Sequence, residues 1–224
     1  SSWETARNNY DALSTVKVKE LNVNGIPYKV QFNPARIVSS GAKVDAKTIK
    51  ERKCFLCPAN LPPVQKGVPF KEHYNILVNP FPIFPRHLTV PEQAHVDQRI
   101  ATRMEDMLDL AQALTDYVIF YNGPKCGASA PDHAHFQAGN KGFLPIEKDW
   151  RNQIAGKVAD YEQATLWYMN DAPRATLVIE SSSKENAVHL FDIIYRSLTV
   201  KPGEEEPMMN VLALYEDEKW VVFV

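Results

Sequence analysis

The sequence lacks three features that would point to common classes of partner or destination. Lys and Arg total 25 against 27 Asp and Glu, so the net charge is −2 and no basic excess suggests a nucleic-acid or membrane surface. No apolar run approaches the roughly 20 residues that span a bilayer, and the start of the chain shows no signal-peptide pattern. We therefore expect a cytoplasmic protein that binds neither nucleic acid nor a membrane.

Cysteine is also scarce, with 3 in the chain, and two of them stand as Cys54-Phe55-Leu56-Cys57. Without a secretory signal, this pair indicates a metal or redox site rather than a structural disulfide. A redox pair usually lies between a strand and a helix start, whereas a proline-rich segment follows here, which favours a metal. Two thiolates at this spacing suit zinc but do not complete its tetrahedron. The candidates for the missing ligands are His73, His87, His95 and His133.

The remaining composition, 45% apolar and 23% charged, suits a globular chain of 224 residues with one large domain or two small ones. Its hydrophobic periods and turn residues predict the secondary structure. The predicted helices are 2–14 with Ser2 as N-cap, 92–116, 149–165 and 184–198. The predicted strands are a hairpin over 16–38 around Asn24-Gly25, then 74–78, 86–90, 117–121, one from His133, 175–180, and a hairpin of 210–215 and 219–224. The predicted loops include polar 39–53, proline-rich 58–69, 122–132 and acidic 202–207.

Short connections between the strands over 74–137 favour antiparallel neighbours with one long helix packed on one face, which is an α+β arrangement. We expect residues 1–224 to form a single domain. The part over 149–224 repeats the strand–helix–strand order without a second His-x-His, and it ends inside the apolar run 220–224. We therefore expect this part to be a degenerate second half-barrel and the chain to be truncated.

The stretch with the most chemistry is His133-Ala134-His135-Phe136-Gln137. Side chains alternate faces along a strand, so His133, His135 and Gln137 would line one wall. The Gly/Ala/Ser-rich turn 127–130 before them can aim backbone N–H groups at an anion. An imidazole held at one nitrogen is a nucleophile towards phosphorus, which makes His135 the catalytic candidate, and Gln137 can exchange hydrogen bonds but not protons. The alternative is an edge strand with a solvated face.

The loop before this strand offers further polar groups. Asn122 ends a predicted strand at the same end of the sheet, and Lys125 and Ser129 are candidate phosphate partners. Gly127 supplies a backbone N–H in the same turn. A plain solvated turn is the alternative for this loop.

Together, these motifs resemble the histidine-triad superfamily in its nucleotidyltransferase branch, over about residues 54–148. Residues 86–95 read Arg-His-Leu-Thr-Val-Pro-Glu-Gln-Ala-His and resemble the superfamily's Gly-His-x-Leu-Val-Ile-Pro-Lys-x-His stretch. Residues 133–137 resemble the triad motif with Gln in the third place, which marks galactose-1-phosphate uridylyltransferases, diadenosine-polyphosphate phosphorylases and GDP-L-galactose phosphorylases. Residues 54–60, 120–122 and 126–129 are similar to uridylyltransferase stretches, and 135–138 with 145–148 to GDP-L-galactose phosphorylases. An uncharacterised bacterial family of this group fits the same motifs.

The resemblance implies an α+β fold of histidine-triad type, an antiparallel sheet with helices packed on it, and the following site. His135 would be the nucleotidylated nucleophile, and Gln137 would hold the phosphoryl oxygens. The residues that would place the phosphates are Asn122, Lys125, Gly127 and Ser129. The ligands of a structural zinc would be Cys54, Cys57, His95 and His133, with His87 as the weaker alternative to His95.

The implied activity is transfer of a nucleoside monophosphate from an NDP-sugar or dinucleoside polyphosphate to phosphate or a sugar phosphate, through a nucleotidyl-histidine. Two alternatives stay open at this point. One is a nucleotide hydrolase of the same fold, and the other is a non-catalytic, zinc-stabilised nucleotide-binding module. The sequence leaves open the base, the sugar, the acceptor and the oligomeric state, for which a homodimer is one option.

Overall fold

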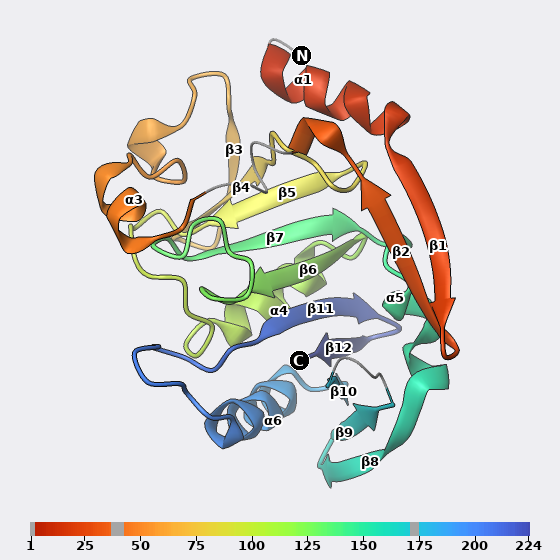
Figure 1. Cartoon of the computed structure of the whole chain (residues 1–224). Helices are drawn as coiled ribbons and strands as arrows, with labels where there is room; N and C mark the ends of the chain where they lie inside the picture. The colour runs from red at the N-terminus through yellow and green to blue at the C-terminus, as the bar shows by residue number, and fades with distance from the viewer. Residues whose placement is uncertain (1–2, 37–42, 171–174) are drawn as a thin grey trace.

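The computed structural model describes residues 3–36, 43–170 and 175–224, and a ten-stranded antiparallel sheet runs through it (Figure 1). The sheet combines strands from the first and second halves of the chain. Its order, edge to edge, is β3 (Gly67–Phe70), β4 (Tyr74–Val78), β5 (His87–Pro91), β7 (His135–Asn140), β6 (Tyr117–Asn122), β11 (Asn210–Glu216), β12 (Lys219–Phe223), β10 (Leu177–Ser181), β9 (Ala164–Met169) and β8 (Ile154–Tyr161). The predicted α+β class with an antiparallel sheet and packed helices is confirmed.

Two helices, α4 (Met104–Ala113) and α6 (Lys184–Ser197), pack together on one face of the sheet and enclose the main core. The apolar stripe of each helix drives this packing, because burial removes those side chains from water. Fully buried residues from both layers meet there, among them Leu108 of α4, Phe191 of α6 and Phe136 of β7. The side chain of Ser183 caps α6 by accepting the N–H of Asn186.

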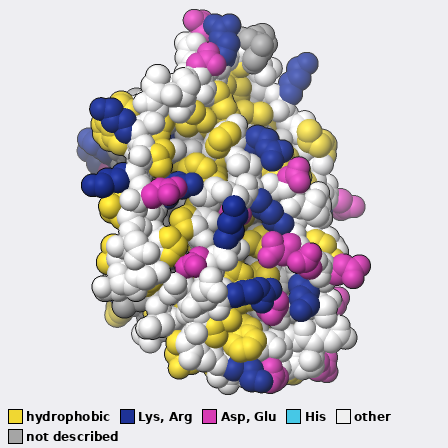
Figure 2. Space-filling view, turned by 90° about the vertical axis from the view of Figure 1, so that its right-hand side faces the viewer, with side chains coloured by type: hydrophobic (Ala, Val, Ile, Leu, Met, Phe, Trp, Pro, Cys, Tyr) yellow, Lys and Arg dark blue, Asp and Glu magenta, His cyan; other side chains and the backbone are white. Residues whose placement is uncertain are grey.

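The N-terminal helix α1 (Glu4–Asp11) and the ribbon β1 (Lys17–Val23) and β2 (Ile26–Phe32) form a separate layer over the loops at one end of the sheet (Figure 1). Gln31 donates to the carbonyl of Ile83, and Lys29 donates to the carbonyl of Phe143. Figure 2 shows this side of the molecule, where Lys and Arg side chains are interspersed with Asp and Glu. Within the described residues, no helix combines the length and the apolar character that crossing a membrane requires.

Several predicted elements are confirmed. The first hairpin turns at Asn24 and Gly25, which both have positive φ, as a two-residue hairpin turn requires. The strand 74–78, the helix 184–198 and the C-terminal hairpin all lie within about one residue of their predicted bounds. The first helix was predicted over 2–14, and α1 occupies Glu4–Asp11 of this range. The predicted N-cap, Ser2, lies outside the described residues.

The predicted helix 92–116 is wrong in its first half, because α4 begins only at Met104. The segment before α4 forms hydrogen bonds with the loop that leads into β7. The carbonyl of Val96 accepts the N–H of Ala134, and the N–H of Gln98 donates to the carbonyl of Pro131. These backbone groups therefore pair across the sheet end instead of along a helix.

Three other predictions are wrong in part. Residues 149–165, predicted as a helix, contain only the end of α5 (Ile146–Asp149), a 3-10 turn and strand β8. The pairing of β8 with β9 has two register shifts, which interrupt the alternation of inward and outward side chains that would have indicated a strand. The polar loop 39–53 contains helix α3 (Ala46–Glu51), which Asp45 caps. The proline-rich segment ends in β3, because an edge strand tolerates Pro69. The strand predicted from His133 begins at His135.

Candidate active site and metal centre

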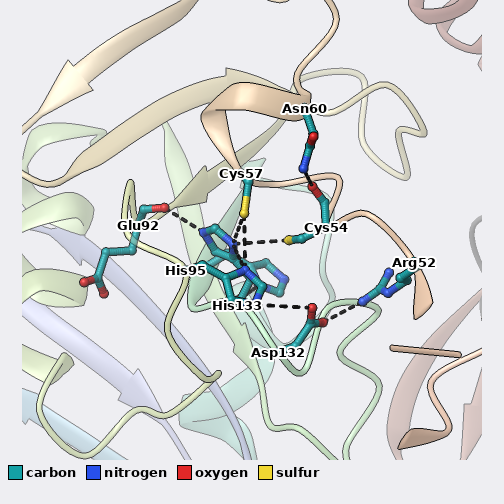
Figure 3. Close-up of polar contacts among 9 residues, drawn as sticks. Arg52, Cys54, Cys57, Asn60, Glu92, His95, Asp132 and His133 are labelled. Atoms are coloured by element: carbon teal, nitrogen blue, oxygen red, sulfur yellow. Dashed lines mark hydrogen bonds and ion pairs between the residues drawn. The ribbon is translucent and has the colours of Figure 1, made fainter. Parts of the chain in front are cut away.

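Cys54, Cys57, His95 and His133 converge, and their four ligand atoms all lie within 4.8 Å of one another (Figure 3). The Sγ of Cys54 is 3.3 Å from Nδ1 of His133, and the Sγ of Cys57 is 3.2 Å from Nδ1 of His95. The two Nδ1 atoms are 3.3 Å apart. A tetrahedral zinc with bonds of about 2.3 Å to sulfur and about 2.0–2.1 Å to nitrogen separates its ligand atoms by about 3.3–3.8 Å, so these residues fit such a metal.

The surroundings of this cluster prepare it for a cation. The carbonyl of Glu92 accepts a hydrogen bond from Nε2 of His133 at 2.7 Å, which orients Nδ1 of that ring towards the cluster. Burial pulls the pKa of the Cys54 thiol up, but the hydrogen bonds with His133 and with backbone N–H groups outweigh it and lower the pKa to about 6. Cys54 is therefore largely a thiolate at neutral pH, the form that binds metals.

The other two histidines that the sequence offered as ligands are engaged elsewhere. His73 lies 3.5 Å from the carboxylate of Asp106. His87 is buried in β5, where its Nδ1 accepts the N–H of Ile83 and its Nε2 donates to Oε1 of Gln137 at 3.0 Å. The choice of His95 over His87 thus agrees with the cluster that the structure forms.

His135 begins β7 directly after the metal cluster, and its ring geometry is fixed. Its Nδ1 lies 2.8 Å from the carbonyl of His133, and since a carbonyl only accepts, Nδ1 carries the proton. Nε2 therefore keeps its lone pair. Burial lowers the pKa of His135 to about 4, so the ring is neutral at pH 7. A neutral imidazole with a free Nε2 has the form that attacks phosphorus.

Gln98 holds the backbone of His135 in this position, and sequence reasoning missed it. Its Oε1 accepts the N–H of His135 at 2.7 Å, and its Nε2 donates to the carbonyls of His135 and Asn122 at 3.1 Å. The buried amide thus joins the start of β7 to the end of β6. The sequence carried no signal for Gln98, because on the predicted helix 92–116 it lies off the apolar face of Val96 and Ile100.

His135 and Gln137 line a cavity of about 620 Å³, as their period-two spacing on β7 predicts. Ser129 from the preceding loop lines the same cavity. The cavity is otherwise bounded by the metal-binding loop, by β4, β5 and the connection between them, and by the N-terminal residues. Its further lining residues are Trp3, Thr5, Lys43, Thr48, Arg52, Phe55, Leu56, Asn60, Pro62, Gln65, Leu77, Asn79, Pro80, Phe81 and Thr89.

The remaining predicted phosphate partners do not line this cavity. Lys125 is exposed and lines a separate cavity of about 120 Å³ together with Glu206. Asn122 ends β6, beside β7, as predicted, and its carbonyl binds Gln98. Gly127 is exposed and has a φ of +102°, a conformation that favours glycine in the turn. Their phosphate-binding roles stay predictions.

Comparisons with known proteins agree with the fold. The family model described as Domain of unknown function (DUF4922) matches residues 1–140. The crystal structure of yeast Ap4A phosphorylase Apa2 is similar, with a TM-score of 0.60, 17% identity, and 99% of this chain and 80% of that chain covered. The same enzyme in complex with Ap4A matches with a TM-score of 0.59 and 18% identity, over 99% and 79% of the two chains.

A DUF4931 family protein from Bacillus cereus ATCC 10987 is also similar, with a TM-score of 0.54 and 17% identity, over 70% of this chain and 83% of that chain. A search of the curated proteins found no match. At these identities, the structural likeness shows the fold alone, and it agrees with the α+β arrangement that the motifs led us to expect.

Proposed function

The chain belongs to the DUF4922 family, and we propose that it is a nucleotidyltransferase that acts through a nucleotidyl-histidine on His135. The donor would be an NDP-sugar or a dinucleoside polyphosphate, and the acceptor would be phosphate or a sugar phosphate. The observation that carries the proposal is the pair of His135, with Nε2 unprotonated, and Gln137, with its oxygen bound to His87, on one cavity wall. The likeness to a phosphorylase that was crystallised with Ap4A supports nucleotide binding here.

In the first step, Nε2 of His135 attacks the α-phosphorus of the donor. A P–N bond forms and the P–O bond to the rest of the donor breaks. The leaving group departs as a phosphate anion that needs no proton, so the step requires charge stabilisation and alignment rather than a general acid. Because His87 occupies Oε1 of Gln137, the NH₂ of that amide is left to donate to a phosphoryl oxygen.

In the second step, an anionic oxygen of phosphate or of a sugar phosphate attacks the same phosphorus. A new P–O bond forms, the P–N bond breaks, and the electron pair returns to Nε2 of His135. This acceptor is already deprotonated, whereas water must lose a proton, which the amide of Gln137 cannot take. The chemistry of Gln137 therefore favours transfer over hydrolysis.

Cys54, Cys57, His95 and His133 would hold a structural zinc. A bound zinc would cross-link the 54–57 loop to the segment before β7, and its binding free energy would stabilise the folded chain. His133 would then be fixed at its ring by the metal, while its carbonyl holds the Nδ1 proton of His135. Ser129 lines the catalytic cavity and would bind a phosphate oxygen.

The test is to trap the adduct with donors labelled at the α-phosphate, covering several NDP-sugars and dinucleoside polyphosphates. We expect an acid-labile, base-stable label on the protein that His135→Ala abolishes. The control His73→Ala, at a residue that does not line this cavity, should retain the label. Phosphate or a sugar phosphate should discharge the adduct far faster than water. Equal discharge by water would support the hydrolase, and nucleotide binding without adduct or turnover would support the binding module.

A further inference from the structure

The charge on the walls of the catalytic cavity is one-sided. Lys43 and Arg52 lie in its lining, and among the described residues that bound it there is no Asp or Glu. By contrast, Glu204, Glu205 and Glu206 line the smaller cavity near Lys125. A cavity lined by one sign of charge concentrates ligands of the opposite sign. The catalytic cavity therefore selects anionic ligands along the wall that carries these two cations, as well as at His135.

Arg52 lies beside Asp132 next to the metal centre (Figure 3), and it also lines the catalytic cavity. Its Nη2 donates to the carboxylate of Asp132 at 2.6 Å, and its guanidinium stacks over the ring of Phe55 at 4.8 Å. The side chain is only 18% exposed, and its Nε–H is buried without a hydrogen-bond partner among the described residues. A buried donor without a hydrogen-bond partner is unfavourable, and a ligand oxygen that reached it would relieve this cost.

The guanidinium is well suited to that ligand. Its planar donors match the oxygens of a phosphate. Because its contact with the ring of Phe55 already restricts the side chain, little conformational entropy is lost when a ligand binds. Arg52 follows α3, whereas His135 and Gln137 come from β7 on another wall. A ligand that contacts both walls must carry anionic groups beyond the phosphate that His135 attacks.

We propose that Arg52, together with Lys43, binds the phosphates of the leaving group, so that the donor is a nucleoside or dinucleoside polyphosphate rather than an NDP-sugar. A leaving sugar phosphate holds its charge on a single phosphate, whereas a polyphosphate chain carries several charges for Arg52 and the exposed Lys43, which line the same cavity as His135. This inference rests on the proposed transfer at His135 for its catalytic meaning, but the anion site itself is independent of it.

Binding of inorganic phosphate, pyrophosphate and tripolyphosphate to the metal-loaded protein tests the site without knowledge of the base. We expect calorimetry to show affinity that rises at least tenfold from phosphate to tripolyphosphate. Arg52→Met should lose about tenfold or more for tripolyphosphate and less than twofold for phosphate, with the metal content unchanged. Arg52→Lys should recover part of the loss. The control Arg86→Met, at an exposed guanidinium over Tyr117, should change neither affinity.

Lys43→Met gives a second measurement at an exposed position, in case loss of Arg52 disturbs the loop near Asp132. Unchanged tripolyphosphate binding in both Met variants would overturn the site, as would an equal loss for phosphate and tripolyphosphate. Labelled nucleoside triphosphate, dinucleoside tetraphosphate and NDP-sugar then separate the donors. Adduct formation from NDP-sugars alone would reject this inference and keep the proposed function. Tripolyphosphate binding that depends on Arg52, without an adduct from any donor, would keep the anion site and reject the proposed function.

Discussion

His87 orients the amide of Gln137, and its own protonation is set by the backbone. The N–H of Ile83 occupies Nδ1 of His87, so the ring proton is on Nε2 and the atom of Gln137 that faces it must be the oxygen. Burial lowers the pKa of His87 to about 4, against the hydrogen bond with Gln137, which raises it. The ring is therefore neutral at pH 7 and acts as a fixed donor.

We predict that His87→Phe lowers kcat of the transfer about tenfold, with a smaller change in KM, because the Gln137 amide loses its fixed orientation. His87→Gln, whose amide reaches the same place, should restore most of kcat. In a double-mutant cycle, His87→Phe should have little further effect once Gln137 is Ala. Equal losses in both backgrounds, or no rescue by Gln, would show that His87 serves only the stability of β5.

The sequence predicted the residues whose partners lie in short motifs. His135 and Gln137 share a wall because of their spacing, and the Cys-x-x-Cys pair restricted the metal ligands to a few histidines. Gln98 and Arg52 could not be predicted in this way, because their partners lie 24 to 80 residues away. No local pattern encodes a side chain that pairs with the backbone of a strand formed later in the chain.

At the scale of elements, the segment 93–103 shows why the helix prediction failed. Its apolar residues have helical spacing, but propensity is a weak preference that tertiary contacts override. The carbonyl of Val96 and the amide of Gln98 bind the backbone before and at the start of β7, and Ile100 donates its N–H to the carboxylate of Glu206. A helix there would have left these groups without their partners.

Glu206, in the loop before β11, is the anchor of this arrangement. It is 3% exposed, and its carboxylate accepts hydrogen bonds from the N–H of Ile100 and the hydroxyl of Tyr121. Burial raises the pKa of Glu206, although both hydrogen bonds oppose the rise. A raised folded-state pKa stabilises the protein below the unfolded value of about 4.3, and this contribution is lost as pH rises through the folded pKa.

We predict that Glu206→Gln removes this pH dependence, because an amide can still accept from Ile100 and pair with Tyr121 but does not titrate. Unfolding by denaturant should be measured from pH 4 to 8 for both proteins, with Glu205→Gln, which pairs with Arg99 at the surface, as the control. The stability of the unaltered protein relative to Glu206→Gln should fall as pH rises above about 4.3. A difference that is constant with pH would contradict the assignment.

At the scale of the whole molecule, one sheet contains strands from both halves of the chain, joined where Ile119 of β6 pairs with Ala213 of β11. The α+β class followed from short local connections, but this order depends on pairing over long sequence separations, which no local pattern specifies. That residues 1–224 form a single domain with a degenerate second half-barrel stays a prediction. The metal centre joins the segment before β3 to the start of β7, next to β6 in the same sheet.

This placement predicts what metal removal does to the molecule. About one zinc per chain should be found by elemental analysis, and Cys54→Ser and His95→Ala should each lower it. Free zinc at about 100 Kd would stabilise the folded chain by about 2.7 kcal/mol, so chelation should lower Tm by several degrees. Full metal retention in both variants would refute the site.

Chelation should act on one region, because the cluster joins the 54–57 loop to His95 and to His133 before β7, while the core between α4, α6 and the sheet holds no metal ligand. After chelation, amide hydrogen exchange should become faster over about residues 43–66 and 93–100, which contain the metal ligands Cys54, Cys57 and His95. Exchange should stay slow in α6 and β12. Exchange that accelerates uniformly would mean that the metal supports global folding. Because Arg52, Phe55 and Leu56 line the cavity, tripolyphosphate affinity should fall with the same chelator concentration that releases this loop.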